Sequence, residues 1–350
     1  MRRYAYGEGF GRRFFLAAAD LETTAIGDQP LTGGTRLDRE RAVVAFWGRF
    51  FQRLLRSTVL LLCVLTSVFA LLRAVPGGPF DGERELPPEA TAALQAHYGT
   101  DKSFLRSYFR YVGRTVRGDL GPSFRQLGWS VNELLADKAR ASFELGAYAF
   151  LLAILLGVPW GCWAAFYPDK FFCRTSMSAA TVLICIPSFA LGPLLCQIFS
   201  LRLHWLRVMG WSGWRCKVLP TITLGLIQAA FLARLTRRSL ACEFARPYVR
   251  TARAKGLSEG AIFWKHVFRN GIGPIIAYVG PICAALLSGT FAVENIFHIP
   301  GLGRLFIESI GNRDYGVVTG IVLLYSLLIL ICNFFADTLL AAIGPRSGSG

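Results

Sequence analysis

The chain has 350 residues, of which 53% are hydrophobic, and its mean hydropathy is +0.43. These values are high for a water-soluble protein of this length and indicate membrane-spanning segments. The formal net charge is +16, but much of the basic excess lies beside apolar runs: residues 234–273 hold nine Lys/Arg and two acidic residues. This distribution argues against nucleic acid as a partner.

Six apolar stretches are long enough to cross about 30 Å of hydrocarbon. They lie near residues 55–75, 143–167, 177–201, 218–233, 274–293 and 317–343. The third stretch is interrupted by Pro187, which removes a backbone hydrogen bond and predicts a helix kink. Two interpretations of this kink remain open, a purely structural one and a role in a translocation path.

The bias of Lys and Arg between the short loops sets the orientation. It places the basic loop 234–273 and both chain termini in the cytoplasm. Residues 202–217 lie outside in this orientation although they carry four basic residues, and the nine basic residues of the cytoplasmic loop outweigh them. This external segment also contains three tryptophans, which fit either an interfacial aromatic belt or a surface for a substrate or partner.

The predicted domain organisation follows from these spans. Residues 1–45 are mixed in charge and contain turn-forming pairs, which predicts a partly disordered cytoplasmic extension. A transmembrane domain occupies 46–343 and includes an external loop at 76–142, and residues 344–350 form a tail.

The most distinctive short segment lies inside the basic loop. Pro247 suits the first turn of a helix, and Gly256 suits the left-handed residue just past its end. About nine helical residues fit between them, roughly 13 Å of helix. Ser258 then caps a second helix that carries Glu259 in its first turn. An exposed helix of this kind predicts a surface that another protein grips; the alternative is binding of anionic lipid, at about 1 kcal/mol per basic residue.

This segment resembles the cytoplasmic coupling loop of ABC-importer permeases, in particular the B-type permease subunits of dipeptide and oligopeptide importers. Pro247 departs from the aspartate that is more usual there, and Gly78 likewise replaces an aspartate. Further matching segments follow in the expected order within residues 46–345, at 73–79, 98–102, 117–123, 186–189, 294–297, 300–303 and 313–315.

The resemblance implies an all-α membrane protein with six transmembrane helices, the type I ABC importer permease fold, and a cytoplasmic coupling helix. It implies a multi-pass permease of the bacterial cytoplasmic (inner) membrane that imports peptides and forms half of the translocation path. The implied partners are a second permease subunit, two cytoplasmic ABC ATPase subunits and an extracytoplasmic substrate-binding protein. Nickel and oligosaccharides are alternative cargoes within the same permease class.

In this interpretation the ATPases bind the short basic helix. The implied coupling residues are Tyr248, Val249, Arg250, Thr251, Ala252, Arg253, Ala254, Lys255 and Gly256. Alanines allow close approach, Tyr248 and Val249 offer apolar contact, and the three basic residues supply charge.

A second candidate element follows the fifth span. The sequence Pro-Gly-Leu-Gly predicts a tight turn that lets the chain re-enter the membrane surface, followed by a short amphipathic helix that stops at Gly311-Asn312. This helix either lines an entrance near the docked binding protein or lies on the bilayer. The residues assigned to the external element are Glu294, Phe297, Pro300, Gly301, Leu302, Gly303 and Asp314.

The sequence contains no recognisable catalytic, metal or nucleotide-binding motif. There is no G-x-x-x-x-G-K-[ST], no C-x-x-C or H-E-x-x-H, and no G-x-S-x-G on a predicted span. We therefore expect neither a catalytic residue nor a cofactor in this chain. A self-contained secondary carrier or channel is the alternative function, and it would hold ionisable residues near the bilayer centre. The charges in or beside the spans lie toward the ends instead: Arg56, Arg73, Glu144 and Asp337.

Overall fold

The computed structural model describes residues 51–70 and 104–343, apart from residues 53, 124, 127, 289 and 313. The predicted extension and tail, and the matching segments that precede residue 104, lie outside the described residues. The chain divides into the units Met1–Leu54 and Leu55–Gly350, and the arrangement given below is that of the second unit.

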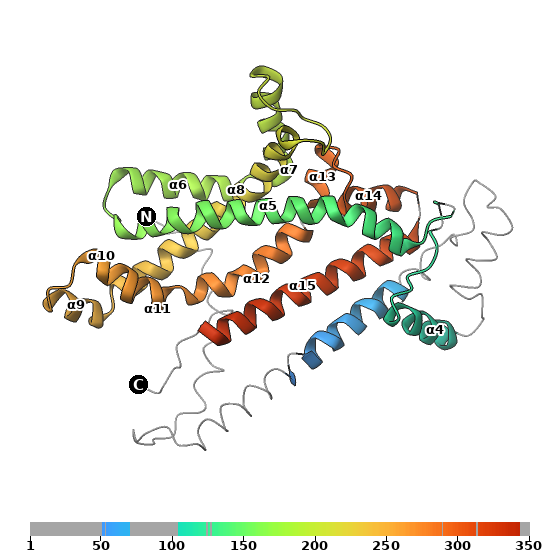
Figure 1. The fold of residues 1–350 in the computed structure, drawn as a ribbon, viewed down its shortest axis with the longest axis horizontal. Coiled ribbons are helices and arrows are strands. Elements are labelled where there is room, and N and C mark those ends of the chain that lie inside the picture. The colour runs from blue at the N-terminus through green and yellow to red at the C-terminus, as the bar shows by residue number, and fades with distance from the viewer. Residues whose placement is uncertain are drawn as a thin grey trace, which may run out of the picture. The chain divides into compact units, whose positions relative to one another are not determined.

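Helices form nearly all of the regular structure in the described part of the chain, where a single β-bridge joins Pro122 and Ser130. In chain order the elements are Leu54–Ala70, α4 (Phe104–Val116), α5 (Val131–Phe166), α6 (Phe171–Cys185), α7 (Ser188–Leu195), the π-helical η1 (Cys196–Arg202), α8 (Trp214–Phe244), α9 (Pro247–Ala254), α10 (Glu259–Ile262), the π-helical η2 (Phe263–Phe268), α11 (Arg269–Gly271), α12 (Gly273–Ser288), α13 (Thr290–Ile296), α14 (Leu302–Gly311) and α15 (Tyr315–Ile343). Figure 1 shows α9 and α10 at one end of the long helices and α14 toward the other.

Four of the described helices are long and apolar enough to cross a membrane: Val131–Phe166, Trp214–Phe244, Gly273–Ile296 and Gly316–Leu339. The bent pair α6 and α7–η1 raises the number to five if it forms one span. The helix Leu54–Ala70 coincides with the predicted first span but is shorter than the others within the described residues. The fold is therefore all-helical with several apolar spans, and the number six remains a prediction.

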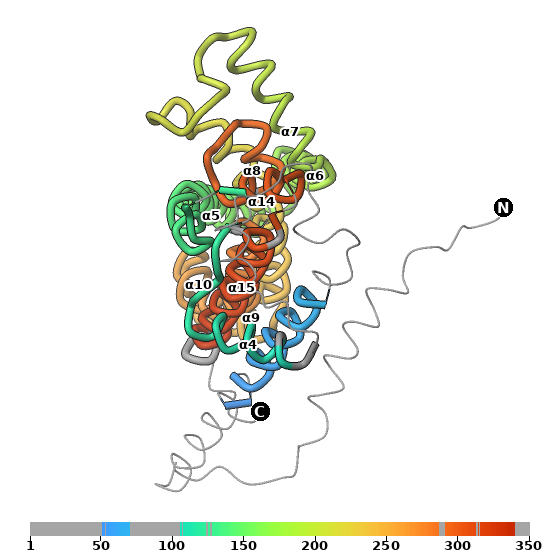
Figure 2. The backbone as a smooth tube through the Cα atoms, turned by 90° about the vertical axis from the view of Figure 1, so that its right-hand side faces the viewer, coloured from blue at the N-terminus to red at the C-terminus, as the bar shows by residue number. Residues whose placement is uncertain are grey.

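Pro187 breaks the third span more sharply than the predicted kink. The two helices that flank it meet at 106°. The residue before a proline is pushed out of the helical region, and Ile186 accordingly has an extended backbone, with ψ 120°. Figures 1 and 2 both show α7 and the chain that follows it projecting away from α15.

Helix α5 begins well before the predicted span 143–167, inside the segment predicted as an external loop. A capping box starts it: Ser130 Oγ accepts a hydrogen bond from Glu133 N at 3.2 Å, and Glu133 Oε2 accepts one from Ser130 N at 2.9 Å. The long helix α8 likewise extends beyond the predicted 218–233 at both ends, so the basic loop proper starts after Phe244.

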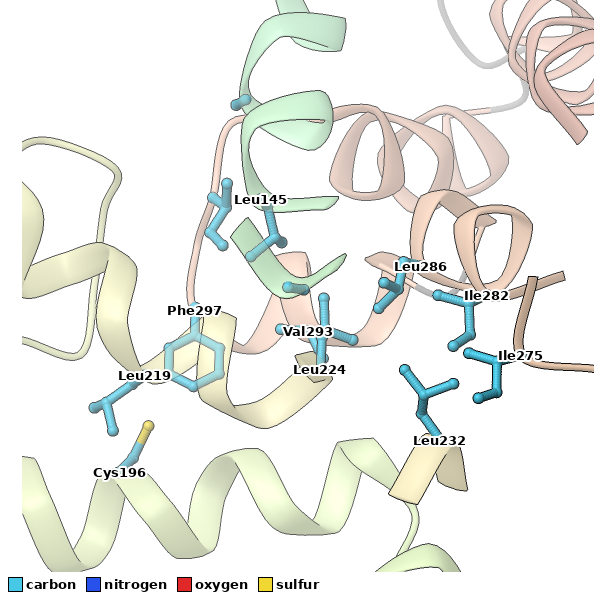
Figure 3. Packing of buried hydrophobic residues seen from close by; sticks show 13 residues of the cluster. Leu145, Cys196, Leu219, Leu224, Leu232, Ile275, Ile282, Leu286, Val293 and Phe297 are labelled. Atoms are coloured by element: carbon cyan, nitrogen blue, oxygen red, sulfur yellow. The ribbon is translucent and has the colours of Figure 1, made fainter. Parts of the chain in front are cut away.

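The core lies where α5 and α8 cross. A Cβ built at Gly161 would lie 2.5 Å from the carbonyl oxygen of Ala233, so only glycine permits this approach. Larger side chains from both helices and from α12 fill the adjacent space, together with Phe297, which follows α13; Leu145 of α5 is among them (Figure 3). This packing fixes the helix ends that carry the two candidate elements.

Candidate coupling helix and external helix

Helix α9 has both of the ends that the sequence predicts. Pro247 occupies its first turn, and Gly256 has the left-handed φ of +76° just past its end. The N–H of Gly256 donates to Arg253 O at 2.9 Å, and the N–H of Leu257 donates to Ala252 O at 3.3 Å. These two bonds make a Schellman motif, which satisfies the last carbonyl groups of the helix.

One face of α9 is buried within this chain. Val249 is 0% exposed and Ala252 is 6% exposed. Both belong to a cluster of buried residues with Ala165, Leu240, Ile262, Phe263 and Val267. Their side chains hold α9 against the ends of α5 and α8 and against η2, and their role in coupling stays a prediction.

The opposite face of α9 is open. Tyr248 is half-buried at its edge, and its hydroxyl donates to Glu243 Oε2 at 2.6 Å. Burial and this carboxylate raise the pKa of Tyr248. The exposed residues of the predicted coupling set are Arg250, Thr251, Arg253, Ala254, Lys255 and Gly256.

Arg253 joins α9 to α10. Its Nε donates to Glu259 Oε1 at 2.7 Å and its Nη2 to Glu259 Oε2 at 3.1 Å. This bidentate contact with the guanidinium lowers the pKa of Glu259. Ser258 Oγ accepts from Ala261 N at 3.4 Å and caps α10, as predicted. The charge of Arg253 is therefore partly neutralised by Glu259 within the same loop.

At the other end of the bundle, Glu294 is 0% exposed although it is a carboxylic acid. Its Oε1 accepts a hydrogen bond from Ser142 Oγ at 2.7 Å. Its Oε2 accepts from Gly303 N at 2.7 Å and from Arg304 N at 3.3 Å. The N–H groups at a helix start have no intrahelical acceptor, so Glu294 caps α14 from a distance and ties it to α5.

The turn before α14 is packed too tightly for side chains on its glycines. A Cβ built at Gly301 would overlap Glu294 Oε2 and lie 2.5 Å from Ser142 Oγ. Pro300 is exposed, whereas Leu302 is buried against α5 and α15 in one cluster with Leu305. Leu302 and Leu305 of α14 are therefore covered by protein, whereas Ile307 and Ile310 are exposed.

Asp314 and Phe297 fix the flanks of this external element. Asp314 is buried and its Oδ2 accepts hydrogen bonds from Ser123 Oγ and, at 3.3 Å, from Arg125 N. Phe297 is 0% exposed and packs into the main core, while its carbonyl accepts from Gly210 N at 3.2 Å. The segments 117–123 and 294–315 therefore meet. Neither Ser123, the partner of Asp314, nor Ser142, the partner of Glu294, is among the residues that the sequence assigns to the external element.

Segment 202–217, which the charge bias predicts to be external, is partly anchored. Trp211 Nε1 donates to Glu144 Oε2 at 2.8 Å, and Lys217 pairs with the other oxygen of this carboxylate. Trp205 and Trp214 are exposed. Glu144 lies in α5, which begins at Val131, close to the start of the predicted span 143–167, and it has a cationic partner.

Neither end presents an obvious metal site. Among the residues that the structure describes, no group of three or more His, Cys, Asp or Glu side chains is placed to hold a metal ion. The arrangement instead consists of two short helices, each pinned by buried contacts to the long helices and each carrying an exposed face. Such elements can transmit force or bind other proteins.

The sequence is similar to those of known transport permeases. The oligopeptide transport system permease protein OppB of Escherichia coli K12 is 38% identical over 297 residues, which cover 84% of this chain and 97% of OppB. The dipeptide transport system permease protein DppB of Bacillus subtilis 168 is 37% identical over 290 residues, covering 83% and 94%.

Solved structures share the fold. A chain of the MetNI methionine ABC transporter in an inward-facing conformation matches with a TM-score of 0.51 at 17% identity, covering 60% of this chain and 96% of that one. The family profile described as the inner membrane component of binding-protein-dependent transport systems matches residues 157–348. The fold is that of the type I ABC importer permeases, and the chain belongs to the family of binding-protein-dependent transport system inner membrane components.

Proposed function

We propose that this chain is the permease subunit of a peptide importer and that α9 couples it to ATPase subunits. The cargo assignment rests on the oligopeptide and dipeptide permeases that it resembles over most of its length. The observation that carries the coupling role is the construction of α9: a short helix closed at both ends, with one face buried in the permease and the other exposed.

The buried face of α9 couples its position to that of the membrane helices on which it packs. Val249 and Ala252 are packed against the ends of α5 and α8 and against η2. A partner that displaces α9 therefore displaces those helices as well, because packed interiors resist compression. The exposed side chains Arg250, Thr251 and Lys255 form the surface that the ATPase grips, and closure of the ATPases moves the spans between inward- and outward-facing states.

The external helix serves the binding protein in this proposal. Helix α14 lies toward the end of the bundle opposite α9 (Figure 1), and buried contacts of Glu294 and Asp314 hold its two ends in place. Its exposed side includes Ile307 and Ile310. A rigid helix with an exposed apolar edge is suited to border the entrance and to contact the docked substrate-binding protein.

The energy for transport comes from other chains in this proposal, since the sequence has no phosphate-binding loop of the G-x-x-x-x-G-K-[ST] type. A second permease subunit completes the path, and two cytoplasmic ATPases bind α9 and its counterpart. Loop 234–273 and both termini then lie in the cytoplasm, in agreement with the bias of positive charge.

Reconstitution tests the proposal. Proteoliposomes that contain this chain, the second permease subunit and both ATPases should take up a radiolabelled oligopeptide only when ATP and the binding protein are present. Excess nickel or oligosaccharide should not compete with the peptide. Substrate uptake by this polypeptide alone would instead identify a secondary carrier, and selective uptake of nickel or oligosaccharide would replace the cargo assignment.

A further inference from the structure

A cavity of about 900 Å³ opens between α6 and α8 and is not part of either candidate element. Its lining residues recur every three or four positions on both helices, so one face of each helix forms a wall. The volume lies within the roughly 300–1,000 Å³ typical of small-molecule sites. Four arginines line it, Arg174 from α6 and Arg234, Arg237 and Arg238 from α8.

The charge of this cavity is not compensated by the chain. No acidic residue is among its lining residues. The ion pairs formed between described residues involve other cations, so none of the four guanidinium groups has a carboxylate partner in the described part of the chain. Gathering four like charges is unfavourable, and an anion between them would relieve the repulsion. Guanidinium groups bind phosphate through parallel N–H donors.

The cavity is also polarised along the helices. Helices α6 and α8 run in opposite directions (Figure 1), so Arg174, near the start of α6, faces the part of α8 that leads to α9. Ile184 and Phe231 line the cavity farther from the α9 end. The site therefore has a basic rim on the side of α9 and an apolar wall toward the middle of the spans. This pattern suits an amphiphile with a phosphate head and a hydrocarbon tail.

We propose that the cavity binds one anionic phospholipid from the leaflet on the side of α9. Arg174, Arg237 and Arg238 hold its phosphate, and an acyl chain lies along Ile184 and Phe231. Basic pockets between membrane helices are known to select anionic headgroups. A bound lipid joins α6 to α8 just before the loop that carries α9. The proposal is independent of the cargo and of the coupling role, because it depends on the cavity alone.

Native mass spectrometry of the purified full chain in detergent tests this site. Dioleoyl phosphatidylglycerol should be retained and dioleoyl phosphatidylcholine should not. The double variant Arg237→Gln/Arg238→Gln should bind phosphatidylglycerol at least about tenfold more weakly. The matched control Arg202→Gln/Arg207→Gln removes the same charge from two arginines that do not line the cavity and should change retention less than about twofold. Equal retention of the two lipids, or unchanged retention by the first variant, would overturn the proposal.

Two further measurements decide the matter if the arginine variant folds poorly. Ala241→Trp fills the cavity but keeps every arginine, and it should also abolish retention of phosphatidylglycerol. Cys242 lines the cavity and is exposed, so bound lipid should slow its alkylation relative to the exposed Cys185. Equal protection by inorganic phosphate would identify a free-anion site instead. Loss of the co-purifying second permease subunit with lipid retention unchanged would assign the cavity to a subunit contact.

Discussion

The carboxylate of Glu294 accepts the backbone N–H of Gly303 at 2.7 Å, and both residues are buried. Gly303 lies in the first turn of α14, where free N–H groups and the helix dipole favour a negative group. The same carboxylate receives the hydroxyl of Ser142 from α5. One side chain therefore joins α13, α14 and α5 at the end of the bundle opposite α9.

Removing this carboxylate should loosen α14. Glu294→Ala leaves the buried donors of Ser142 and Gly303 without an acceptor, which typically costs roughly 1–3 kcal/mol. We expect a clearly lower thermal unfolding midpoint in detergent. The control is Glu308→Ala, which breaks only the exposed pair with Arg304 and should cost about 0–1 kcal/mol. Equal midpoints for the two variants would show that the buried contacts of Glu294 do not stabilise the external element.

Substitution of Gly301, which faces Glu294, should also destabilise the protein. Gly301→Ala places a Cβ against Glu294 Oε2 and Ser142 Oγ, and such overpacking typically costs about 1–3 kcal/mol. Gly311→Ala meets nothing within 4 Å and should leave the midpoint nearly unchanged. The comparison uses thermal unfolding of both proteins at matched detergent concentration. A Gly301→Ala protein as stable as the control would mean that the turn has room to relax.

Local signals predicted α9 well, because helix caps depend on neighbouring residues. Pro247 and Gly256 marked its start and stop without any tertiary information. The same kind of local signal marks the start of α5, where Ser130 and Glu133 form a capping box. Hydrophobicity alone predicts only the apolar part of this helix, 143–167, and so misses its first turns. Pro187 predicted an interruption of the third span. The size of the bend, 106°, depends on packing between helices, which the sequence does not show.

Contacts between distant segments could not be predicted in this way. Nothing local to Ser142 connects it with Glu294, and nothing near Ser123 connects it with Asp314. The inward face of α9 is an intermediate case. Val249 and Ala252 are spaced by three in a mostly polar helix, a pattern that predicts a buried face but not whether this chain or a partner covers it.

The Arg253–Glu259 pair predicts a pH effect on the coupling loop. The pKa of Glu259 is lowered in the folded loop from its usual 4.5. Stability from this pair is therefore present above pH 4.5 and is lost as the pH falls through the lowered value. Amide hydrogen exchange of α9 and α10, corrected for intrinsic rates, should accelerate across that range, and Glu259→Gln should abolish the change. An identical pH dependence in the variant would exclude this ion pair as the cause.

The proposed orientation predicts which segments a membrane-impermeant thiol reagent reaches from outside. In a background whose exposed native cysteines are replaced by serine, the Arg117→Cys protein should be labelled in intact cells. The Gly260→Cys protein, with its thiol in the loop of α9 and α10, should react only after the cells are opened. Both positions are exposed in the structure, so accessibility within the protein does not explain a difference. The reverse labelling pattern would invert the topology.

The end of α9 offers the sharpest test of coupling. Gly256 has φ +76°, and no atom beyond its own chain neighbours lies within 4 Å of the position that a Cβ would take there. A substitution therefore acts through backbone strain, roughly 1–2 kcal/mol. Gly256→Val should leave the protein inserted in the membrane while reducing both ATPase co-purification and peptide uptake. Gly260→Ala also meets open space but lacks the left-handed backbone, and it should behave as the unmodified chain does.

Two further substitutions separate the faces of α9. Lys255→Gln removes one exposed charge, worth about 0–1 kcal/mol, and should reduce uptake only slightly. Ala252→Asp places a charge in the buried cluster beneath α9, where an unpaired charge is strongly unfavourable. Ala252→Asp should therefore disorder the loop and, as a consequence, release the ATPases. Rapid amide exchange of α9 would reveal this disorder. If the Gly256→Val and Ala252→Asp proteins keep their ATPases and transport at the normal rate at matched expression, α9 is not the coupling element, and its basic face would then serve the membrane surface.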